Sequence, residues 1–240
     1  MSKSTQAISE AINLCLKRPI LFLPALAPII IQVIFLVLGY VVFPTAINTG
    51  FTFQGIEIPG AVYYAPNPWL IWGGYFLAAL FGFIASCMVI DMANDSINAR
   101  TVDLGKSLNF VTGKLGTLIV AAIIAALCAI TFVLFPVALF IITIAVIEGT
   151  DAVESTKRSI NFVLRNLGEV IVFIIIVIVV AVIFGIGFAL IPVVGPYLGA
   201  ILNWIISVVW AVAALSFYHS LRGNPQETPL PPPPPPPPTY

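Results

Sequence analysis

Long stretches without a charged side chain constrain this chain more than any other feature of its sequence. Uncharged runs cover residues 20–56, 58–90, 115–147 and 170–226, the last interrupted by Arg222. Crossing a bilayer core of about 30 Å takes about 20 helical residues, because the backbone must satisfy its own hydrogen bonds there. Each run reaches that length. The sequence therefore predicts an all-α, polytopic membrane protein.

The composition excludes a soluble globular domain. Apolar residues make up 60% of the 240-residue chain and charged residues 8%, against roughly 45–50% and 25% in soluble domains. Ten basic and ten acidic residues cancel, which leaves no basic surplus for binding nucleic acid. The lipid bilayer is the first partner that we expect.

Four spans follow directly from the apolar runs. We expect them at residues 20–43, 69–90, 170–191 and 197–218. The segment 44–67 carries several glycines and prolines and is predicted to be a loop, while Pro192 and Pro196 bracket a tighter turn. Aromatic rings crowd this loop and the start of the second span, which is typical of a belt at the headgroup level.

The run 115–147 needs a second argument, because as one helix it would be about 50 Å long. A single span would divide the ten basic residues between two sides of the membrane, whereas a hairpin that bends near Pro136 places them all on one side. Basic residues near span ends are retained in the cytoplasm. We therefore predict six transmembrane helices in the plasma membrane, with both termini cytoplasmic. The third and fourth spans have roughly 16 to 18 residues, so we expect them to thin the bilayer, lie against neighbours or cross incompletely.

Three short segments that each precede a span match one another without gaps. They are residues 11–15 (AINLC), 107–111 (SLNFV) and 159–163 (SINFV). On a helix their apolar residues fall on one face, and such helices are too short and too polar to cross a bilayer. We expect three amphipathic helices in the cytoplasmic interface. The basic side chains expected at the membrane surface are Lys17, Arg18, Lys106, Lys114, Lys157, Arg158 and Arg165.

The same segments predict an internal repeat. An interfacial helix followed by two spans would be used three times, over residues of about 4–90, 91–149 and 150–222. These units would form a threefold pseudo-repeat within one membrane domain, residues 1–222. A chance likeness between short amphipathic linkers is the alternative.

The region around Glu148 resembles a known group of proteins. Residues 135–149 begin with Phe-Pro and close on Ile-Glu-Gly, and residues 154–162 have the sequence ESTKRSINF. This combination is similar to a broad group of poorly characterised prokaryotic six-span membrane proteins. The group consists of domains of unknown function and includes the membrane domain attached to some glycerophosphodiester phosphodiesterases. The resemblance implies a fold and a compartment, but not phosphodiesterase activity, because the sequence contains no catalytic domain of that kind.

Groups that could carry catalysis or ion coupling are scarce within the predicted spans. Acidic residues stand at cytoplasmic span ends or in the basic connections. There we expect a structural ion pair between Glu148 and Arg158, with coupled-ion chemistry as the alternative. The three cysteines and the single histidine lack the spacing of a metal site. We expect no catalytic residue, cofactor or metal, and a protein that is not an enzyme.

Small residues recur at helical spacing in two spans. Gly74 and Gly82 mark the second span, and Gly199, Asn203 and Ser207 mark the sixth. Small side chains let helices approach closely, and an Asn can hydrogen-bond across such a contact for about 1 kcal/mol. We predict helix-packing seams there, with a pore lining as the alternative.

A proline-rich segment of a different kind follows the spans. Residues 223–240 include eight consecutive prolines, which favour a stiff polyproline II helix of about 3.1 Å per residue. Because aromatic-lined grooves bind such segments, we expect a disordered cytoplasmic tail that docks a polyproline-binding protein. The candidate contacts are Pro231, Pro234 and Pro238, and a plain spacer is the alternative.

Three classes of function stay open from the sequence. The first is a non-enzymatic membrane protein that organises lipid or anchors a cytoplasmic partner through its interfacial helices and tail. The second is a transporter or channel for a small or apolar solute, which a continuous polar cavity beside Asn203 or Gln32 would favour. The third is the membrane subunit of an enzyme complex. The lack of charge within the spans favours the first, and assembly with a second copy of the chain is open in all three.

Overall fold

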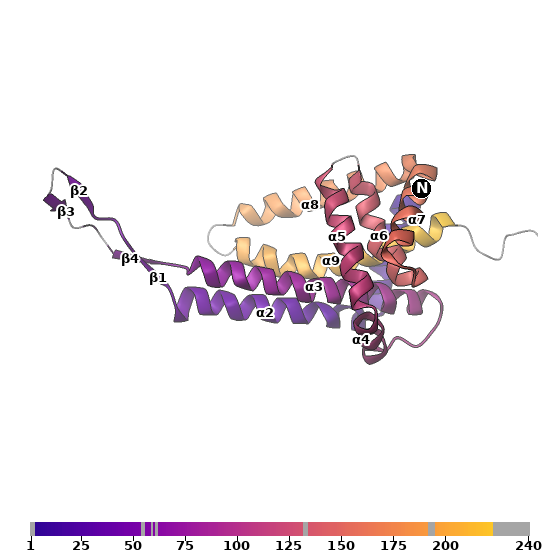
Figure 1. The fold of residues 1–240 in the computed structure, drawn as a ribbon, viewed down its shortest axis with the longest axis horizontal. Helices are drawn as coiled ribbons and strands as arrows, with labels where there is room; N and C mark the ends of the chain where they lie inside the picture. The colour runs from indigo at the N-terminus through magenta and orange to yellow at the C-terminus, as the bar shows by residue number, and fades with distance from the viewer. Residues whose placement is uncertain are drawn as a thin grey trace, which may run out of the picture.

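Four long apolar helical stretches dominate the computed structural model. It describes residues 3–53, 56–58, 60, 62–131, 134–191 and 195–222. The tail, with Pro231, Pro234 and Pro238, lies outside the described residues, as does most of the predicted turn at 192–196. Within the described part, the stretches long and apolar enough to cross a membrane are Pro19–Val42, Pro68–Ile97, Leu167–Ala189 and Tyr197–Arg222. They run along the long axis (Figure 1), as expected for a helical membrane protein.

The first of these stretches is irregular and the other three are continuous helices. It consists of a 3₁₀ segment, η1 (Pro19–Ala25), an α-helix, α2 (Leu26–Val37), and a π segment, η2 (Leu38–Val42). A proline at position 24 removes one backbone donor there. The others are α3 (Pro68–Ile97), α8 (Leu167–Ala189) and α9 (Gly195–Arg222).

Helix α3 has a defined beginning and extends past its predicted end. The Asn67 side chain accepts a hydrogen bond from the Trp69 N–H at 3.1 Å, as an N-cap does. At the other end the helix continues beyond residue 90 to residue 97. The buried Asp95 carboxylate there binds Lys106 at 3.1 Å and Arg100 at 3.6 Å. These ion pairs stabilise turns of α3 that the apolar run alone did not predict.

The run 115–147 forms a helical hairpin rather than one rod. Its arms are α5 (Leu115–Ile130) and α6 (Phe135–Glu148). Pro136 fits the first turn of α6, where no N–H donor is needed. Lys114 Nζ donates a hydrogen bond to the Gly149 carbonyl at 3.0 Å, so the two ends of the run lie together.

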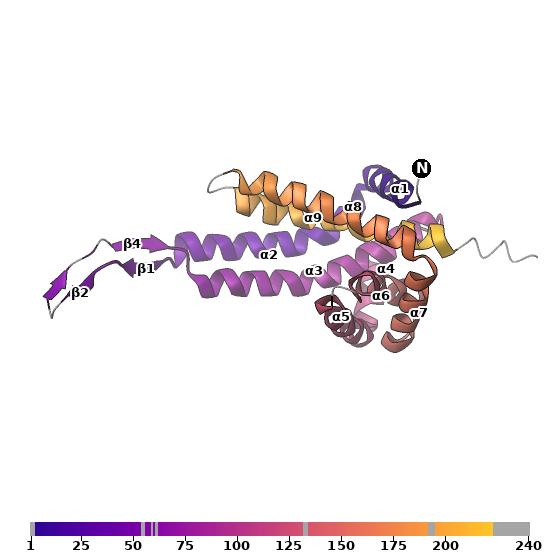
Figure 2. The ribbon, with the colours of Figure 1, turned by 90° about the horizontal axis from the view of Figure 1, so that it is seen from above.

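The hairpin does not lie parallel to the long helices. In Figures 1 and 2 it runs across their axis, at the end of the molecule that holds the N-terminus. Its arms have 16 and 14 residues and reach about 24 and 21 Å at ~1.5 Å per residue. This is short of the about 30 Å of a bilayer core, so full crossing by α5 and α6 stays a prediction.

Three short helices occupy the matched segments. They are α1 (Lys3–Lys17), α4 (Leu104–Gly113) and α7 (Ala152–Arg165), and each ends two residues after its matched segment. We call these helices, together with the last turn of α9, the charged end of the molecule (Figure 2). The first and fifth residues of every matched segment are buried, namely Ala11, Cys15, Ser107, Val111, Ser159 and Val163.

Buried serines attach two of these helices to the helix that precedes each of them. Ser107 Oγ donates to the Met88 carbonyl at 3.1 Å, and Ser159 Oγ donates to the Val137 carbonyl at 2.7 Å. The two serines hold the same position in their matched segments. Helix α4 is thereby attached to α3, and α7 to α6.

The segment 44–67 forms strands where we predicted a loop. β1 (Thr45–Asn48) pairs antiparallel with β4 (Val62–Ala65), and β2 (Phe51–Phe53) pairs with β3 (Ile56–Ile58). β-Branched or aromatic residues, which pack well on a pleated surface, occur in all four strands. The strands make a narrow extension at the end opposite the charged end (Figure 1).

Helices α2, α3 and α9 approach one another closely at two glycines. A Cβ atom added at Gly74 would overlap the Phe35 side chain of α2, and one added at Gly82 would overlap the Trp204 ring of α9. Trp204 Nε1 donates a hydrogen bond to Gln32 Oε1 at 2.6 Å. Because Gln32 is 3% exposed, this bond satisfies a polar group that no water reaches. The Trp204 ring is therefore fixed from two sides.

We predict that Gly82→Ala destabilises the protein in mild detergent by about 1–3 kcal/mol, the usual cost of overpacking a core. The added methyl group displaces Trp204 and lengthens its hydrogen bond to Gln32. Gly187→Ala on α8 is the matched control, because an added Cβ there meets nothing within 4 Å. Thermal unfolding followed by tryptophan fluorescence measures the difference, and equal midpoints for the two variants would contradict the prediction.

Candidate functional site

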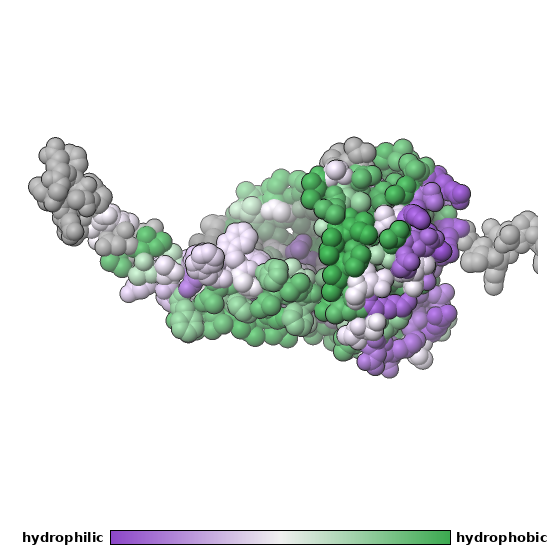
Figure 3. Space-filling model, viewed as in Figure 1, coloured by the Kyte–Doolittle hydropathy of each residue, from purple (hydrophilic) through white to green (hydrophobic). Residues whose placement is uncertain are grey.

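Polar side chains gather at one end of the molecule. Figure 3 shows hydrophilic residues concentrated at the charged end, and apolar residues over the long helices and the α5–α6 hairpin. The consecutive helices α6 and α7 meet α9, which is distant in sequence, at this end. Their meeting point is the candidate site.

A tight turn between α6 and α7 builds one side of the site. Gly149 follows α6 with a φ of 63°, a left-handed conformation that favours glycine. Asp151 caps α7, because its Oδ1 accepts a hydrogen bond from the Glu154 N–H at 2.7 Å. The turn folds α7 back along α6.

Glu148, the last residue of α6, is a buried carboxylate with three partners. Its side chain is 6% exposed. Oε1 accepts a hydrogen bond from the Tyr218 hydroxyl at 2.6 Å and forms an ion pair with Arg222 Nη1, also at 2.6 Å. Oε2 forms an ion pair with Arg158 Nη1. The pair expected between Glu148 and Arg158 is thus one part of a larger cluster, which joins α6, α7 and α9.

Arg158 is shared between two carboxylates. Its Nε donates to Glu154 Oε1 at 2.8 Å, one turn away on α7, while Nη1 contacts Glu148. Hydrogen bonds to Glu154 and Glu148 raise the pKa of the Arg158 guanidinium above its ordinary value. The group is therefore charged at every physiological pH, and two of its three nitrogens are oriented by the protein.

Aromatic rings underlie the Glu148 cluster. Phe162 of α7 meets Phe140 of α6 edge to face, with ring centroids 5.0 Å apart, and lies 4.9 Å from the Tyr218 ring. Phe173 of α8 stacks on Phe217 of α9 at 4.6 Å. These rings exclude water from one side of the carboxylate, and polar interactions are stronger in such low-dielectric surroundings.

The basic residues predicted at the membrane surface fall into two further groups. Lys106 and Lys114 are held by the protein itself, through Asp95 and the Gly149 carbonyl. The others are exposed and form no ion pair with any described residue. They are Lys17, Arg18, Lys157 and Arg165.

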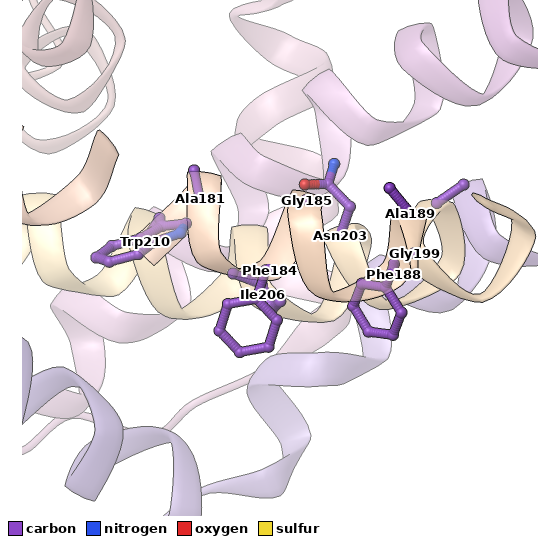
Figure 4. A pocket seen from close by; sticks show the side chains of 10 residues that line it. Ala181, Phe184, Gly185, Phe188, Ala189, Gly199, Asn203, Ile206 and Trp210 are labelled. Carbon is purple, nitrogen blue, oxygen red and sulfur yellow. The ribbon is translucent and has the colours of Figure 1, made fainter. Parts of the chain in front are cut away.

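A separate cavity of about 440 Å³ lies between α8 and α9 (Figure 4). Its lining is apolar or aromatic except for Asn203, whose carboxamide has no hydrogen-bond partner among the described residues. Gly199 lies against Phe188 of α8, and the Ser207 hydroxyl donates within its own helix, to the Trp204 carbonyl at 2.7 Å. Asn203 therefore lines a cavity, where we expected it to hydrogen-bond across a seam.

The cysteines do not form a reactive or metal-binding group. Cys15 and Cys87 are buried, Cys128 is half-buried, and all three are free thiols. Burial raises the pKa of the Cys15 thiol to about 11, so it stays protonated and unreactive. Within the described part of the chain, no group of three or more His, Cys, Asp and Glu residues could hold a metal ion.

Two partners of Glu148 were not found from the sequence. Tyr218 and Arg222 lie one turn apart on the last part of α9, and Tyr218 is 70 residues beyond Glu148. The one available signal was an aromatic and a basic side chain at helical spacing where the last span ends. Such a pattern does not indicate which distant carboxylate they bind.

We predict that Glu148→Ala lowers the free energy of unfolding in detergent by about 2 kcal/mol, in the range measured for hydrogen bonds to charged groups. The change leaves the Tyr218 hydroxyl and two guanidinium groups without their shared acceptor. Glu154→Ala is the matched control, because its carboxylate is half-exposed and surface ion pairs contribute little. Denaturant titration measures both variants. Equal losses would show that Glu148 has no special structural role.

Residues 69–219 match the model of a family described as a domain of unknown function, DUF7847. No curated protein and no solved structure matches the chain. The resemblance to the membrane domains of phosphodiesterases stays a prediction. The family match includes Glu148, Arg158 and Tyr218, and it covers more than half of the 240 residues, so the chain belongs to the DUF7847 family.

Proposed function

We propose that this protein is a non-enzymatic integral membrane protein that organises lipid at its charged end and anchors a cytoplasmic partner there. The observation that carries the proposal is the set of three amphipathic helices, α1, α4 and α7, at one end of a group of apolar helices (Figure 2). Helices of this kind lie in the interface, with an apolar face toward the acyl chains and basic side chains toward headgroups. The buried serines of α4 and α7 fix those helices at that level.

The proposed orientation places the charged end on the cytoplasmic side of the plasma membrane. All ten basic residues belong to α1, α4, α7, the last turn of α9 or the adjoining connections, whereas the segment 44–67 has none. Basic residues near span ends are retained in the cytoplasm. Both termini are then cytoplasmic.

The proposed plan has three like units, each made of one short helix and two membrane helices. Helix pairs α2–α3, α5–α6 and α8–α9 each follow a matched helix, and all three matched helices end at the same aligned position. The outer face of α5 supports a lipid environment for the middle pair, because its side chains are apolar and Ile130 is 80% exposed. The pair returns to the charged end whether or not its arms cross fully.

Anchoring of a partner is proposed from the sequence of residues 223–240. A polyproline II segment loses little conformational entropy on binding, which suits it to aromatic-lined grooves. The segment follows Arg222 directly, so a bound protein would be held beside the Glu148 cluster. Comparing the proteins retained by the full chain and by a chain ending at residue 222, in mild detergent, tests this part of the proposal.

Passage of a small apolar solute is a second candidate function, and the cavity beside Asn203 favours it. A polar amide without a protein partner is costly among acyl chains, unless a solute or a neighbouring chain binds it. If proteoliposomes take up a small apolar solute and the Asn203→Leu substitution abolishes this uptake, transport is favoured over lipid organisation as the function. Co-purification of a soluble enzyme would instead support the third class, a membrane subunit of an enzyme complex.

We predict that a cysteine at Thr49 reacts with a membrane-impermeant maleimide only from outside intact cells, and one at Val153 only from inside. Both positions are exposed, and they lie at opposite ends of the molecule. Both cysteines are introduced into a Cys128→Ala background, which removes the half-buried thiol. This background alone is the blank, because its remaining cysteines, Cys15 and Cys87, are buried. Labelling of both positions from the same side would overturn the proposed orientation.

We predict that neutralising Lys17, Arg18 and Lys157 together lowers the preference of the reconstituted protein for anionic lipid by at least about fivefold. Each basic side chain near an anionic surface contributes about 1 kcal/mol, and these three form no ion pair with a described residue. Electron spin resonance of spin-labelled phosphatidylglycerol measures the preference, with spin-labelled phosphatidylcholine as the control lipid. An unchanged preference would count against lipid organisation by the charged end.

A further inference from the structure

A cavity of about 260 Å³ opens beside the Glu148 cluster, between α7 and the end of α9. It is smaller than the roughly 300–1,000 Å³ of most ligand cavities. Three guanidinium groups border it, two from α7 and one from the end of α9, and Arg165 and Arg222 are more than fifty residues apart in sequence. Its lining residues are Glu148, Arg158, Phe162, Arg165, Asn166, Tyr218, Leu221 and Arg222.

The lining carries more positive than negative charge. Three arginines border the cavity against one carboxylate, Glu148, and the Glu148 oxygens are already taken by Tyr218, Arg158 and Arg222. Glu154 binds Arg158 from outside the lining. Among the described residues Arg165 forms no ion pair. The cavity thus offers unused guanidinium N–H donors and a net positive charge.

We propose that this cavity binds the phosphate group of an anionic phospholipid. A guanidinium donates two parallel hydrogen bonds to phosphate oxygens, which a lysine ammonium does not. Arg158 and Arg222 are held in place through Glu148, so two of the donors are oriented before a ligand arrives, and Arg165 supplies the third. The inference rests on the proposed function, because it uses the charged end as the part of the protein at the headgroup level.

A lipid source of the phosphate is favoured by the other lining residues. Phe162 and Leu221 present apolar surface to the same cavity as the arginines, which suits a glycerol backbone joined to a phosphate. The adjoining α7 is amphipathic, and its exposed Leu164 stands beside Arg165, where acyl chains begin. A soluble phosphate would use the guanidinium groups alone.

Binding of monomeric dihexanoyl phosphatidic acid to the purified full chain in a neutral detergent tests the proposal. We expect Arg165→Gln to weaken binding about tenfold, the loss of one charge-assisted hydrogen bond, and Arg165→Lys to recover part of it. Lys3→Gln is the matched control, because it removes one exposed positive charge from the charged end outside the cavity. We expect that control to bind within twofold of the parent. Unchanged thermal midpoints show that the variants are folded.

Two further probes identify the source of the phosphate. If glycerol 3-phosphate binds as tightly as dihexanoyl phosphatidic acid, the ligand is a soluble phosphate and the lipid assignment is overturned. If dihexanoyl phosphatidylcholine binds as tightly as dihexanoyl phosphatidic acid, the site does not select an anionic headgroup and that part of the proposal is overturned. Equal effects of Arg165→Gln and Lys3→Gln would overturn the site itself. Because the measurement uses no bilayer, it is independent of the labelling experiment. A wrong orientation and an absent site therefore give different results.

Discussion

The hydrogen bond from Lys114 to the Gly149 carbonyl marks the constraint on which the charged end depends. It brings together the two ends of the uncharged run 115–147, which is more than thirty residues long. Since that segment returns to its starting point, α4 and α7 lie at the same end of the molecule. Glu148 is then brought within reach of α9, whose final turn carries Tyr218 and Arg222. A single continuous rod would have separated these groups by about 50 Å.

The parts of the fold that follow from charge and length alone were predictable from the sequence. Helices α3, α8 and α9 lie where the uncharged runs lie, and the bend of the hairpin follows from Pro136 and from the distribution of basic residues. The four short strands were missed because each has only three or four residues, too few for a clear alternation. The transverse direction of the α5–α6 hairpin depends on packing between distant helices, which no local pattern encodes.

The candidate site shows the same division between local and distant contacts. Glu148 and Arg158 are ten residues apart and joined by one tight turn, so their ion pair could be expected from the sequence. Gly82 was identified by its spacing, but its contact with Trp204 depends on how α9 lies against α3. Asn203 shows the limit of spacing arguments, because it lines a cavity between α8 and α9, whereas Gly199 of the same stripe lies against Phe188.

A buried carboxylate inside a cationic cluster has two opposite effects on the phosphate site that we propose. Glu148 cancels one of three positive charges, which weakens the attraction for an anion. It also holds Arg158 and Arg222 in one arrangement, so that a ligand does not have to order two long side chains, each of which would cost about 0.5–1.5 kcal/mol to immobilise. Without the Glu148 carboxylate between them, the guanidinium groups of Arg158 and Arg222 would repel each other and turn toward water. The residue that joins three helices is therefore also the one that sets the geometry of the proposed site, and it favours selectivity for a group of matching shape over general attraction to negative charge.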